Sequence, residues 1–504
     1  SSRRSVLLKI GCLIEANRDE FVNIIINEVG KTKAEAVAEI DYSKSFLTYV
    51  ADLMKSENFS EKIDKERKVL SVPRGAGLLI TPFNDPLAGI TRKLANCLGS
   101  GAGAVIKPPE LGIKTASKLE SIIKERRFDH LATFIRTKDR NLVKKLIDSE
   151  EIGTISFTGS TDVGRILSGY AGASLKPFVG ELGGTNPFII FSDGNVDKAV
   201  EDLVTRKTKS AGQACSAQNI VFVERKIASQ VIDKIDAAFR NIRALPTNEF
   251  GNAKMGPVRS RSAIRNLLNF EKRLTNEGAK LVCGLNDDKA TGRGYMFNPV
   301  SYLSDNPEIF LQHEIFAPLM GIYVFDDRSR LKEIIRKNKQ PLVLYTYSSD
   351  KEYLAKFTSG LNYGSIGLNH TGIQGAFVPT GGFKQAGLGR EGGEWGLREF
   401  TTTINVRSNS GCKNQRMREI IQTDKAPASS SPVSQGTKGG GLVFVGGQMP
   451  RDMDSGMIVK GALEQARLSL KYCVTILNEA GSGIDDVLIA VVYMTDLGQK
   501  NAVN

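Results

Sequence analysis

Apolar residues follow two alternating patterns along most of the chain. Short continuous runs, such as GAGLLITPF (75–83) and PFIIF (187–191), are typical of strands buried on both faces. Between such runs, as in SVLLKIGCLIEANRDEFVNIIINEVGK (5–31), apolar residues recur at the spacing of amphipathic helices. Strands that alternate with helices predict parallel sheets covered by helices on both faces, which is an α/β fold. Further strands are expected at 103–110, 154–160, 219–225, 321–327 and 342–348, and further helices at 86–101, 111–127 and 161–172.

The pattern changes after Val406. RSNSGCKNQRMR lacks apolar periodicity, so residues 408–418 are a candidate linker. A second unit is expected over 419–504, and its order of elements predicts part of a separate α+β domain. Its strand, long amphipathic helix and final strand are expected at 442–450, 461–481 and 486–497.

Composition narrows the class of protein. The 504 residues are too many for one core, and 41% apolar with 24% charged residues is typical of a soluble globular protein. No apolar run reaches the ~18 residues that would span a bilayer. The formal net charge of +13 comes from short basic clusters without interleaved aromatic residues. This favours solvated helix faces over nucleic-acid binding, and it suits anionic substrates.

The six cysteines are scattered without a CxxC pair, and only three histidines are present, which predicts a reducing, cytoplasmic setting and no metal site. Cys215 lies in SAGQACSAQN (210–219), among small residues. A free cysteine is often simply a buried core residue. Small neighbours would also let a substrate approach a nucleophilic cysteine closely. From this stretch alone, both interpretations stand.

Four other short stretches place notable residues at bends in the chain. FTGSTDVG follows a predicted strand and opens a helix, where Gly159 and Gly164 allow a phosphate to approach helix N–H groups. Glu181 in VGELGGTNP and Glu314 in HEIFAP are candidate acids or bases. Asn84 in TPFNDP lies between two prolines, which fix its backbone. Each stretch also fits an ordinary turn or a surface residue.

The chain resembles the aldehyde dehydrogenase superfamily over about residues 1–407, through motifs in this order: TPFN, KPPE, FTGST, ELGGTNP, GQAC, EIFAP and GGFKQAGLGREGG. The resemblance implies a Rossmann-like cofactor domain at 1–183, a catalytic α/β domain at 184–385 and a bridging segment at 386–407. Strands at about 55–73 and in the bridging segment would pair between subunits, giving a homodimer or homotetramer. Relative to the family, the chain looks shortened at its N-terminus.

The resemblance implies three catalytic residues. Cys215 would add to the aldehyde carbon and form a thiohemiacetal, its thiolate favoured by the positive potential of the site, including that of the cofactor. The Asn84 amide and the Cys215 N–H would stabilise the oxyanion. Hydride transfer would leave a thioester, and Glu181 would activate the water that hydrolyses it to a carboxylic acid.

The resemblance also implies NAD as cofactor, with NADP as the alternative. Lys107 and Glu110 would hold the adenosine ribose, and Glu110 would repel a 2′-phosphate. Ser160 would lie at the pyrophosphate, and Glu314 with Phe316 at the nicotinamide ribose. The other cofactor-binding residues implied are Thr81, Phe83, Gly159, Gly164 and Leu182.

The second unit resembles the reactive-intermediate deaminase (RidA/YjgF) family through IIQTDKAPASSSPVSQG, LVFVGGQMP and DVLIAVVYMTDL. Members hydrolyse enamines or imines, and only part of their fold is expected here. At the adenine side of the first unit, RRFDHLATFIRTKD (126–139) replaces a segment that is Gly- and Pro-rich in most dehydrogenases. Three hypotheses follow: an aldehyde dehydrogenase acting on a small-molecule aldehyde, a degenerate dehydrogenase that serves as a non-catalytic association module, and a bifunctional enzyme for amino-semialdehydes.

Overall fold

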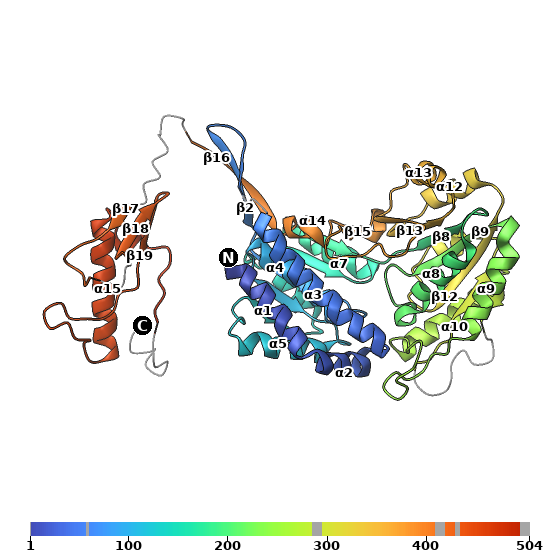
Figure 1. The fold of residues 1–504 in the computed structure, drawn as a ribbon, viewed down its shortest axis with the longest axis horizontal. Coiled ribbons are helices and arrows are strands. Elements are labelled where there is room, and N and C mark those ends of the chain that lie inside the picture. The colour runs from blue at the N-terminus through green and yellow to red at the C-terminus, as the bar shows by residue number, and fades with distance from the viewer. Residues whose placement is uncertain (1, 57–59, 285–294, 409–418, 429–433, 494–504) are drawn as a thin grey trace. The chain divides into compact units, whose positions relative to one another are not determined.

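The computed structural model describes residues 2–56, 60–284, 295–408, 419–428 and 434–493 (Figure 1). The chain forms a large unit, Ser1–Ile63 with Lys68–Val406, and a small unit, Asp64–Arg67 with Arg407–Asn504. Apart from its first residue, the predicted linker at 408–418 lies outside the described residues.

One sheet of the large unit has the strand order β15–β7–β6–β3–β4–β5 and is parallel except at β15. Its strands are β3 (Ala76–Ile80), β4 (Ala104–Lys107), β5 (Ala132–Phe134), β6 (Ile152–Thr158), β7 (Phe178–Glu181) and β15 (Gly387–Leu388). Neighbouring residues of β3 point to opposite faces, so Leu79 packs with α1 to α5 and Leu78 packs with α6 and α7. These helices are α1 (Ser2–Ala16), α2 (Arg18–Val29), α3 (Lys33–Ser56), α4 (Ala88–Ser100), α5 (Ile113–Glu125), α6 (Arg140–Asp148) and α7 (Thr161–Ala173).

A second sheet has the order β10–β11–β12–β9–β8–β13–β14 and is parallel except between β10 and β11. Its strands are β8 (Asn186–Ile190), β9 (Gln218–Glu224), β10 (Lys280–Cys283), β11 (Val300–Leu303), β12 (Leu319–Phe325), β13 (Val343–Tyr347) and β14 (Ser365–Leu368). Phe188 packs with α8 and α9, and Ile189 packs on the side of α10 to α13. Those helices are α8 (Val196–Thr208), α9 (Ala228–Arg240), α10 (Arg261–Asn276), α11 (Glu308–Leu311), α12 (Arg328–Arg336) and α13 (Lys351–Thr358). The predicted α/β fold with parallel sheets covered on both faces is confirmed.

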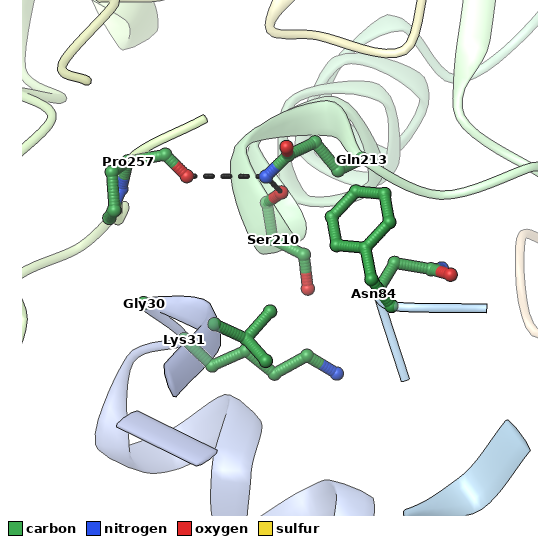
Figure 2. A pocket seen from close by; sticks show the side chains of 8 residues that line it. Gly30, Lys31, Asn84, Ser210, Gln213 and Pro257 are labelled. Carbon is green, nitrogen blue, oxygen red and sulfur yellow. Dashed lines mark hydrogen bonds between the residues drawn. The ribbon is translucent and has the colours of Figure 1, made fainter. Parts of the chain in front are cut away.

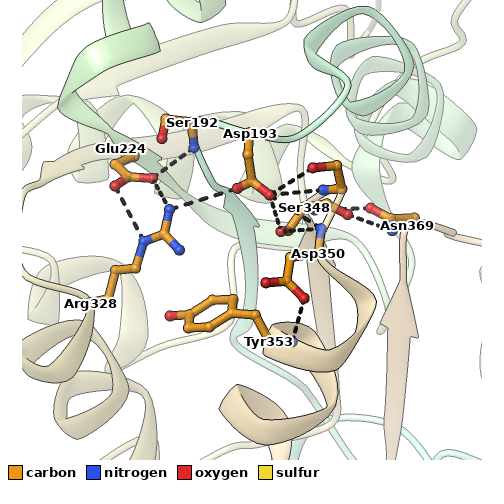
Figure 3. A network of polar contacts seen from close by, with 9 residues as sticks. Ser192, Asp193, Glu224, Arg328, Ser348, Asp350, Tyr353 and Asn369 are labelled. Carbon is orange, nitrogen blue, oxygen red and sulfur yellow. Dashed lines mark hydrogen bonds and ion pairs between the residues drawn. The ribbon is translucent and has the colours of Figure 1, made fainter.

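A polar network ties the segments that follow β8 and β13 to the end of β9 and the start of α12 (Figure 3). Asp193 Oδ2 accepts a hydrogen bond from the Ser349 N–H at 3.0 Å. The Arg328 guanidinium donates to Glu224 at 2.8 Å and lies 4.7 Å from the centroid of the Phe191 ring. None of these side chains lines the cleft described below, so the network serves the stability of this sheet.

A third sheet, with the order β1–β2–β16, is mostly exposed. It consists of β1 (Ser60–Lys62), β2 (Arg67–Pro73) and β16 (Thr401–Arg407), the last of which follows α14 (Gly393–Arg398). All residues of β1 are exposed, and the Ile404 side chain of β16 is 47% exposed. These strands coincide with the segments for which the sequence predicts pairing between subunits. That pairing stays a prediction, as does the division of the large unit at residue 183.

The small unit contains an antiparallel sheet with the order β17–β18–β19 and one long helix. These elements are β17 (Glu419–Ile421), β18 (Gly436–Gly439), β19 (Leu442–Val445) and α15 (Ala462–Glu479). Its core is formed by Ile421, Ala426, Tyr472, Ile476 and Ala480. The predicted helix at 461–481 is therefore confirmed.

The final strand predicted at 486–497 is wrong over its described part. Residues 487–493 form no ladder with any other described strand. Leu488 and Ile489 are 82% and 83% exposed. An apolar run becomes a strand only when a neighbouring strand pairs with it. Among the described residues, no strand pairs with this run.

Candidate active site

A cleft of about 760 Å³ opens in the large unit, where the carboxyl ends of β3, β6 and β7 face the segment that precedes β9. The three candidate catalytic residues, Cys215, Glu181 and Asn84, all line it. Six candidate cofactor residues also line it: Phe83, Gly159, Ser160, Leu182, Glu314 and Phe316. Residues far apart in sequence thus meet where parallel strands end, which is the usual place for a ligand in an α/β fold.

The segment immediately before Cys215 has an unusual backbone. In the turn η1 (Lys209–Gly212), Ser210, Ala211 and Gly212 have φ angles of 50°, 54° and 70°. Non-glycine residues rarely adopt this left-handed conformation, so surrounding contacts must hold it. A Cβ atom on Gly212 would lie 2.3 Å from a backbone oxygen of the EIFAP motif, which excludes any side chain there.

Two buried amide side chains hold this loop. Asn186 donates to the carbonyl oxygens of Cys215 at 2.7 Å and Ala217 at 2.8 Å, and it accepts from the Val343 N–H at 2.9 Å. Gln213 donates to the main chain of η1 at 3.0 Å. Sequence reasoning assigned neither residue a role, although both lie inside motifs that it singled out.

Asn84 lies in the turn after β3, and its half-buried side chain lines the cleft. Among the described residues, its amide group has no hydrogen-bond partner, and neither has the backbone N–H of Cys215. Both groups are therefore free to donate to an atom bound in the cleft.

Glu181 ends β7 and is 3% exposed. Its Oε1 atom finds no hydrogen-bond partner in the described part of the chain. Burial, followed by the negative charge of Glu391, raises the pKa of Glu181 to about 8. A carboxyl group with this pKa can take up and release a proton near neutral pH.

Glu391 belongs to a buried network beside Glu181 that the sequence did not predict. It forms ion pairs with Lys93 and with Arg92, the latter at 3.7 Å. Lys93 also donates to the Ser156 hydroxyl of β6 at 2.9 Å. Glu391 lies in the GGFKQAGLGREGG motif, but 298 positions separate it from Lys93, and no local pattern links the two.

The protein's own groups do not lower the pKa of the Cys215 thiol, and the part of the expected positive potential that comes from the cofactor stays a prediction. Burial, and then the carboxyl groups of Glu181 and Glu314, raises the pKa of Cys215 to about 12. Arg92 acts in the opposite direction, but its charge is shared with Glu391. Burial is therefore the main reason that the protein's own groups disfavour the Cys215 thiolate.

Glu314 is enclosed by the main chain after β7, since a Cβ atom on Gly183 would lie 2.5 Å from its Oε2. Burial raises the pKa of Glu314 to about 7, and its Oε1 has no partner among the described residues. The Phe316 and Phe83 rings lie nearby in the cleft lining, with centroids 5.9 Å apart. A buried carboxyl oxygen that lacks a partner can accept a hydrogen bond from a sugar hydroxyl, which an apolar pocket wall cannot do.

The turn from β6 to α7 forms another part of the lining. Ser160 is the N-cap of α7 and makes no capping bond with its side chain, so the first N–H groups of the helix remain available. Gly159 donates to the Glu181 carbonyl oxygen at 3.1 Å. A Cβ atom on Gly164 would lie 2.4 Å from Leu182, so glycine lets α7 approach the end of β7. This arrangement fits a phosphate group.

Of the ten candidate cofactor residues, Gly164, Thr81, Lys107 and Glu110 do not line the cleft. Lys107 ends β4 half-buried, and within the described ranges its ammonium group makes no hydrogen bond. Glu110 is exposed and pairs at 2.9 Å with Lys138, a residue of the divergent segment 126–139. Thr81 is buried, and its hydroxyl is without a partner in the described structure. The Lys138 charge weakens the repulsion of a 2′-phosphate that the sequence predicts for Glu110.

The described residues contain no group of three or more His, Cys, Asp or Glu side chains placed to hold a metal ion. Within the same ranges, no helix is both long and apolar enough to cross a bilayer. The cleft therefore offers the chemistry of a thiol, carboxyl and amide groups, and cationic side chains.

Comparison with known proteins agrees with this geometry. The model of the aldehyde dehydrogenase family matches residues 1–406, and that of the endoribonuclease L-PSP family, which includes the RidA proteins, matches residues 423–504. The chain belongs to the aldehyde dehydrogenase family. It carries a RidA-like domain at its C-terminal end, and the family uses NAD or NADP.

Several relatives are similar over most of the chain. Succinate-semialdehyde dehydrogenase of Paenarthrobacter nicotinovorans is 31% identical over 411 residues, which are 80% of this chain and 90% of that protein. The 3-sulfolactaldehyde dehydrogenase of Pseudomonas putida is 30% identical over 405 residues, 79% of this chain and 82% of its own. An NADP-named succinate-semialdehyde dehydrogenase of Schizosaccharomyces pombe is 28% identical over 416 residues, 81% of this chain and 84% of its own.

Solved structures share the fold. An aldehyde dehydrogenase from Brucella melitensis biovar abortus 2308 superposes with a TM-score of 0.76 at 29% identity, covering 81% of this chain and 85% of that one. Betaine aldehyde dehydrogenase of Staphylococcus aureus, solved in complex with NAD⁺, gives a TM-score of 0.77 at 25% identity and covers 82% and 83%.

Proposed function

We propose that this protein oxidises an anionic aldehyde to a carboxylic acid, with Cys215 as nucleophile and NAD or NADP as cofactor. The observation that carries the proposal is the meeting of Cys215, Asn84 and Glu181 in one cleft. The unpartnered donors and the raised pKa of Glu181 give each residue a chemical role there.

In the first step, the Cys215 thiol releases its proton to solvent water as Sγ bonds to the aldehyde carbon. The Asn84 amide and the Cys215 N–H donate to the oxyanion that forms. Removing one such donor typically slows the reaction ~10²–10³-fold. The bound cofactor supplies the hydride acceptor, and a thioester remains on Cys215.

In the second step, Glu181 takes a proton from a water molecule as the water oxygen attacks the thioester carbonyl carbon. The carbon–sulfur bond breaks, the carboxylic acid leaves, and the proton held by Glu181 passes to Sγ, so that the Cys215 thiol and the Glu181 carboxylate form again. Because Glu181 has a pKa of about 8, it is a stronger base than an ordinary carboxylate and still ionises close to neutral pH.

For the cofactor, we assign the pyrophosphate to Ser160 and the first turn of α7, and a ribose hydroxyl to Glu314. The free helix N-terminus and the unpartnered Glu314 oxygen support this assignment. Lys107 and Glu110 would hold the adenosine end. Because Lys138 pairs with Glu110, NADP remains as acceptable as NAD.

The anionic character of the substrate is supported by the cations of the cleft. Arg206, Lys209 and Arg259 line it and, unlike Lys31 and Arg92, form no ion pair in the described part of the chain. Two of the relatives are named for aldehydes that carry a carboxylate or a sulfonate. A charge-assisted hydrogen bond to such a group would orient the aldehyde toward Cys215.

The experiment that tests this proposal measures reduction of NAD and NADP with succinate semialdehyde and with butanal, for the wild type and for Cys215→Ala. We expect turnover with a preference for the semialdehyde, and none in the variant. If the wild type oxidises no aldehyde with either cofactor, the non-catalytic hypothesis replaces this one.

The match of residues 423–504 favours a second candidate activity, hydrolysis of an imine or enamine by the small unit. An amino-bearing semialdehyde would then be a substrate for both units, as the bifunctional hypothesis requires. Ammonia release from a 2-imino acid, compared between the full chain and a chain that ends at Arg407, tests this candidate directly.

We further propose a cytoplasmic homodimer or homotetramer. The exposed β1–β2–β16 sheet supports the oligomer, because open strand edges usually find a partner. Light scattering of the purified chain gives the subunit number, and imaging of a tagged chain gives its compartment.

A further inference from the structure

The first turns of α3 contact both loops that carry the proposed reaction. Glu35 and Glu39 lie one helical turn apart, so they project from the same face of α3. Glu35 reaches the loop of Cys215, and Glu39 reaches the loop of Asn84. Neither glutamate lies in a motif singled out from the sequence.

The Glu35 contact holds the strained turn before the nucleophile. Glu35 Oε1 accepts from the Ser210 N–H at 2.6 Å, at the first residue of the left-handed run. Its Oε2 accepts from the Thr32 N–H at 2.9 Å, and the Thr32 hydroxyl accepts from the Glu35 N–H at 3.2 Å. This reciprocal capping box fixes the Glu35 side chain, which in turn fixes the turn.

The Glu39 contact holds the loop that carries Asn84. Glu39 is 4% exposed, and its Oε1 accepts from the Ala88 N–H at 3.1 Å and from the preceding N–H at 2.8 Å, at the start of α4. Its Oε2 accepts from the Lys31 ammonium at 2.7 Å, which also donates to Asp85 at 2.6 Å. Burial opposes a charge on Lys31, but Asp85 and Glu39 raise its pKa, so the ammonium group stays charged at neutral pH.

The two loops meet beside the turn between α2 and α3 with little space between them (Figure 2). A cavity of about 10 Å³ lies between Lys31, Asn84, Ser210 and Gln213, which is room for about one water at most. A Cβ atom on Gly30, in the same turn, would lie 2.4 Å from Pro257. Both loops therefore lie against the turn that opens α3.

We propose that Glu35 and Glu39 are positioning residues that set the distance between the Asn84 amide and the Cys215 N–H. This inference rests on the proposed function, in which those two donors stabilise one oxyanion. Helix α3 then acts as a common support, with one carboxylate on each loop. A displacement of ~1 Å between reacting groups costs ~10²-fold in rate, which is the effect this support prevents.

Glu35→Ala is the variant of choice, because Glu39 is buried and its removal would leave the start of α4 without an acceptor and Lys31 with Asp85 alone. Hydrogen–deuterium exchange is measured on peptides covering residues 209–217, together with kcat and KM for succinate semialdehyde. We expect exchange there to rise at least ~10-fold and kcat to fall ~10–100-fold, with KM changed less than ~2-fold. Glu35→Gln keeps the acceptor oxygen and restores both values to within ~3-fold of the wild type.

Glu28→Ala is the matched control. Glu28 also accepts from backbone N–H groups of another helix, at Lys114 (2.7 Å) and Thr115 (3.0 Å), but it does not line the cleft. The proposal would be overturned if peptides covering 209–217 exchanged equally fast in Glu28→Ala and Glu35→Ala. It would also be overturned if Glu35→Ala exchanged faster there but kept the kcat of the wild type. A wild type without turnover would refute the proposed function instead, and the exchange comparison would still decide whether Glu35 holds the loop.

Discussion

Glu181 illustrates how single residues in this cleft depend on their charged neighbours. Its pKa of about 8 predicts that kcat rises with pH and levels off above that value, because only the carboxylate accepts a proton from water. Glu391→Gln removes the neighbouring negative charge, so the pKa of Glu181 falls and the midpoint of the rise moves to lower pH, by about 0.5–1 unit. A profile of kcat against pH measures this shift. Glu394→Gln, outside the cleft, should leave the midpoint in place; an unmoved midpoint in Glu391→Gln would contradict the assignment.

Lys209 gives a second test at the residue scale. It is exposed at the cleft and has no ion pair within the described residues. Lys209→Met should raise KM for succinate semialdehyde ~10-fold, the loss expected for one charge-assisted contact, and should change KM for butanal less than ~2-fold. Steady-state kinetics with both aldehydes separates the effects. An equal rise for both substrates would indicate a distorted loop rather than a lost anion contact.

At the scale of elements, local patterns predicted what depends on local sequence. The apolar run of β3 and the periodicity of α15 were sufficient, and the motifs singled out Cys215 and Asn84, which both line one cleft. The run at 487–493 was misjudged because its own residues favour a strand, whereas strand formation depends on partners elsewhere. Asn186, Glu391 and the α3 glutamates escaped prediction for a related reason, since each acts through contacts distant in sequence.

The hydrogen bonds of Asn186 link the nucleophile loop to β8 and β13, so their contribution to stability can be tested. Asn186→Ala would leave two buried carbonyl oxygens and the Val343 N–H unpaired, so we expect the free energy of unfolding to fall by ~2–4 kcal/mol. Arg328→Ala removes a partly exposed ion pair and should cost only ~1 kcal/mol. Urea denaturation of both variants gives the comparison. A smaller loss for Asn186→Ala than for Arg328→Ala would mean that the nucleophile loop is held by other contacts.

For the whole molecule, the division into two units has a kinetic consequence. Every residue that lines the cleft, from Lys31 to Glu391, belongs to the large unit. A chain that ends at Arg407 should therefore keep kcat/KM for the aldehyde within ~2-fold of the full chain, because the large unit has its own core. Assays at equal concentration, with circular dichroism to verify folding, measure this. A folded but inactive truncated chain would show that the small unit takes part in dehydrogenation.

The close packing of main chain at Gly183 and Gly212 bears on how a saturation mutagenesis map of this protein should be interpreted. Added side chains would meet Glu314 Oε2 at 2.5 Å and a carbonyl oxygen at 2.3 Å. Gly212 will reject every substitution as firmly as Cys215 does, although it contributes no reacting atom, whereas a side chain at Gly183 requires the Glu314 carboxyl group to move. A position that tolerates no substitution in such a map is either sterically crowded or needed for the reaction. A variant that folds but does not turn over substrate shows that the residue is needed for the reaction.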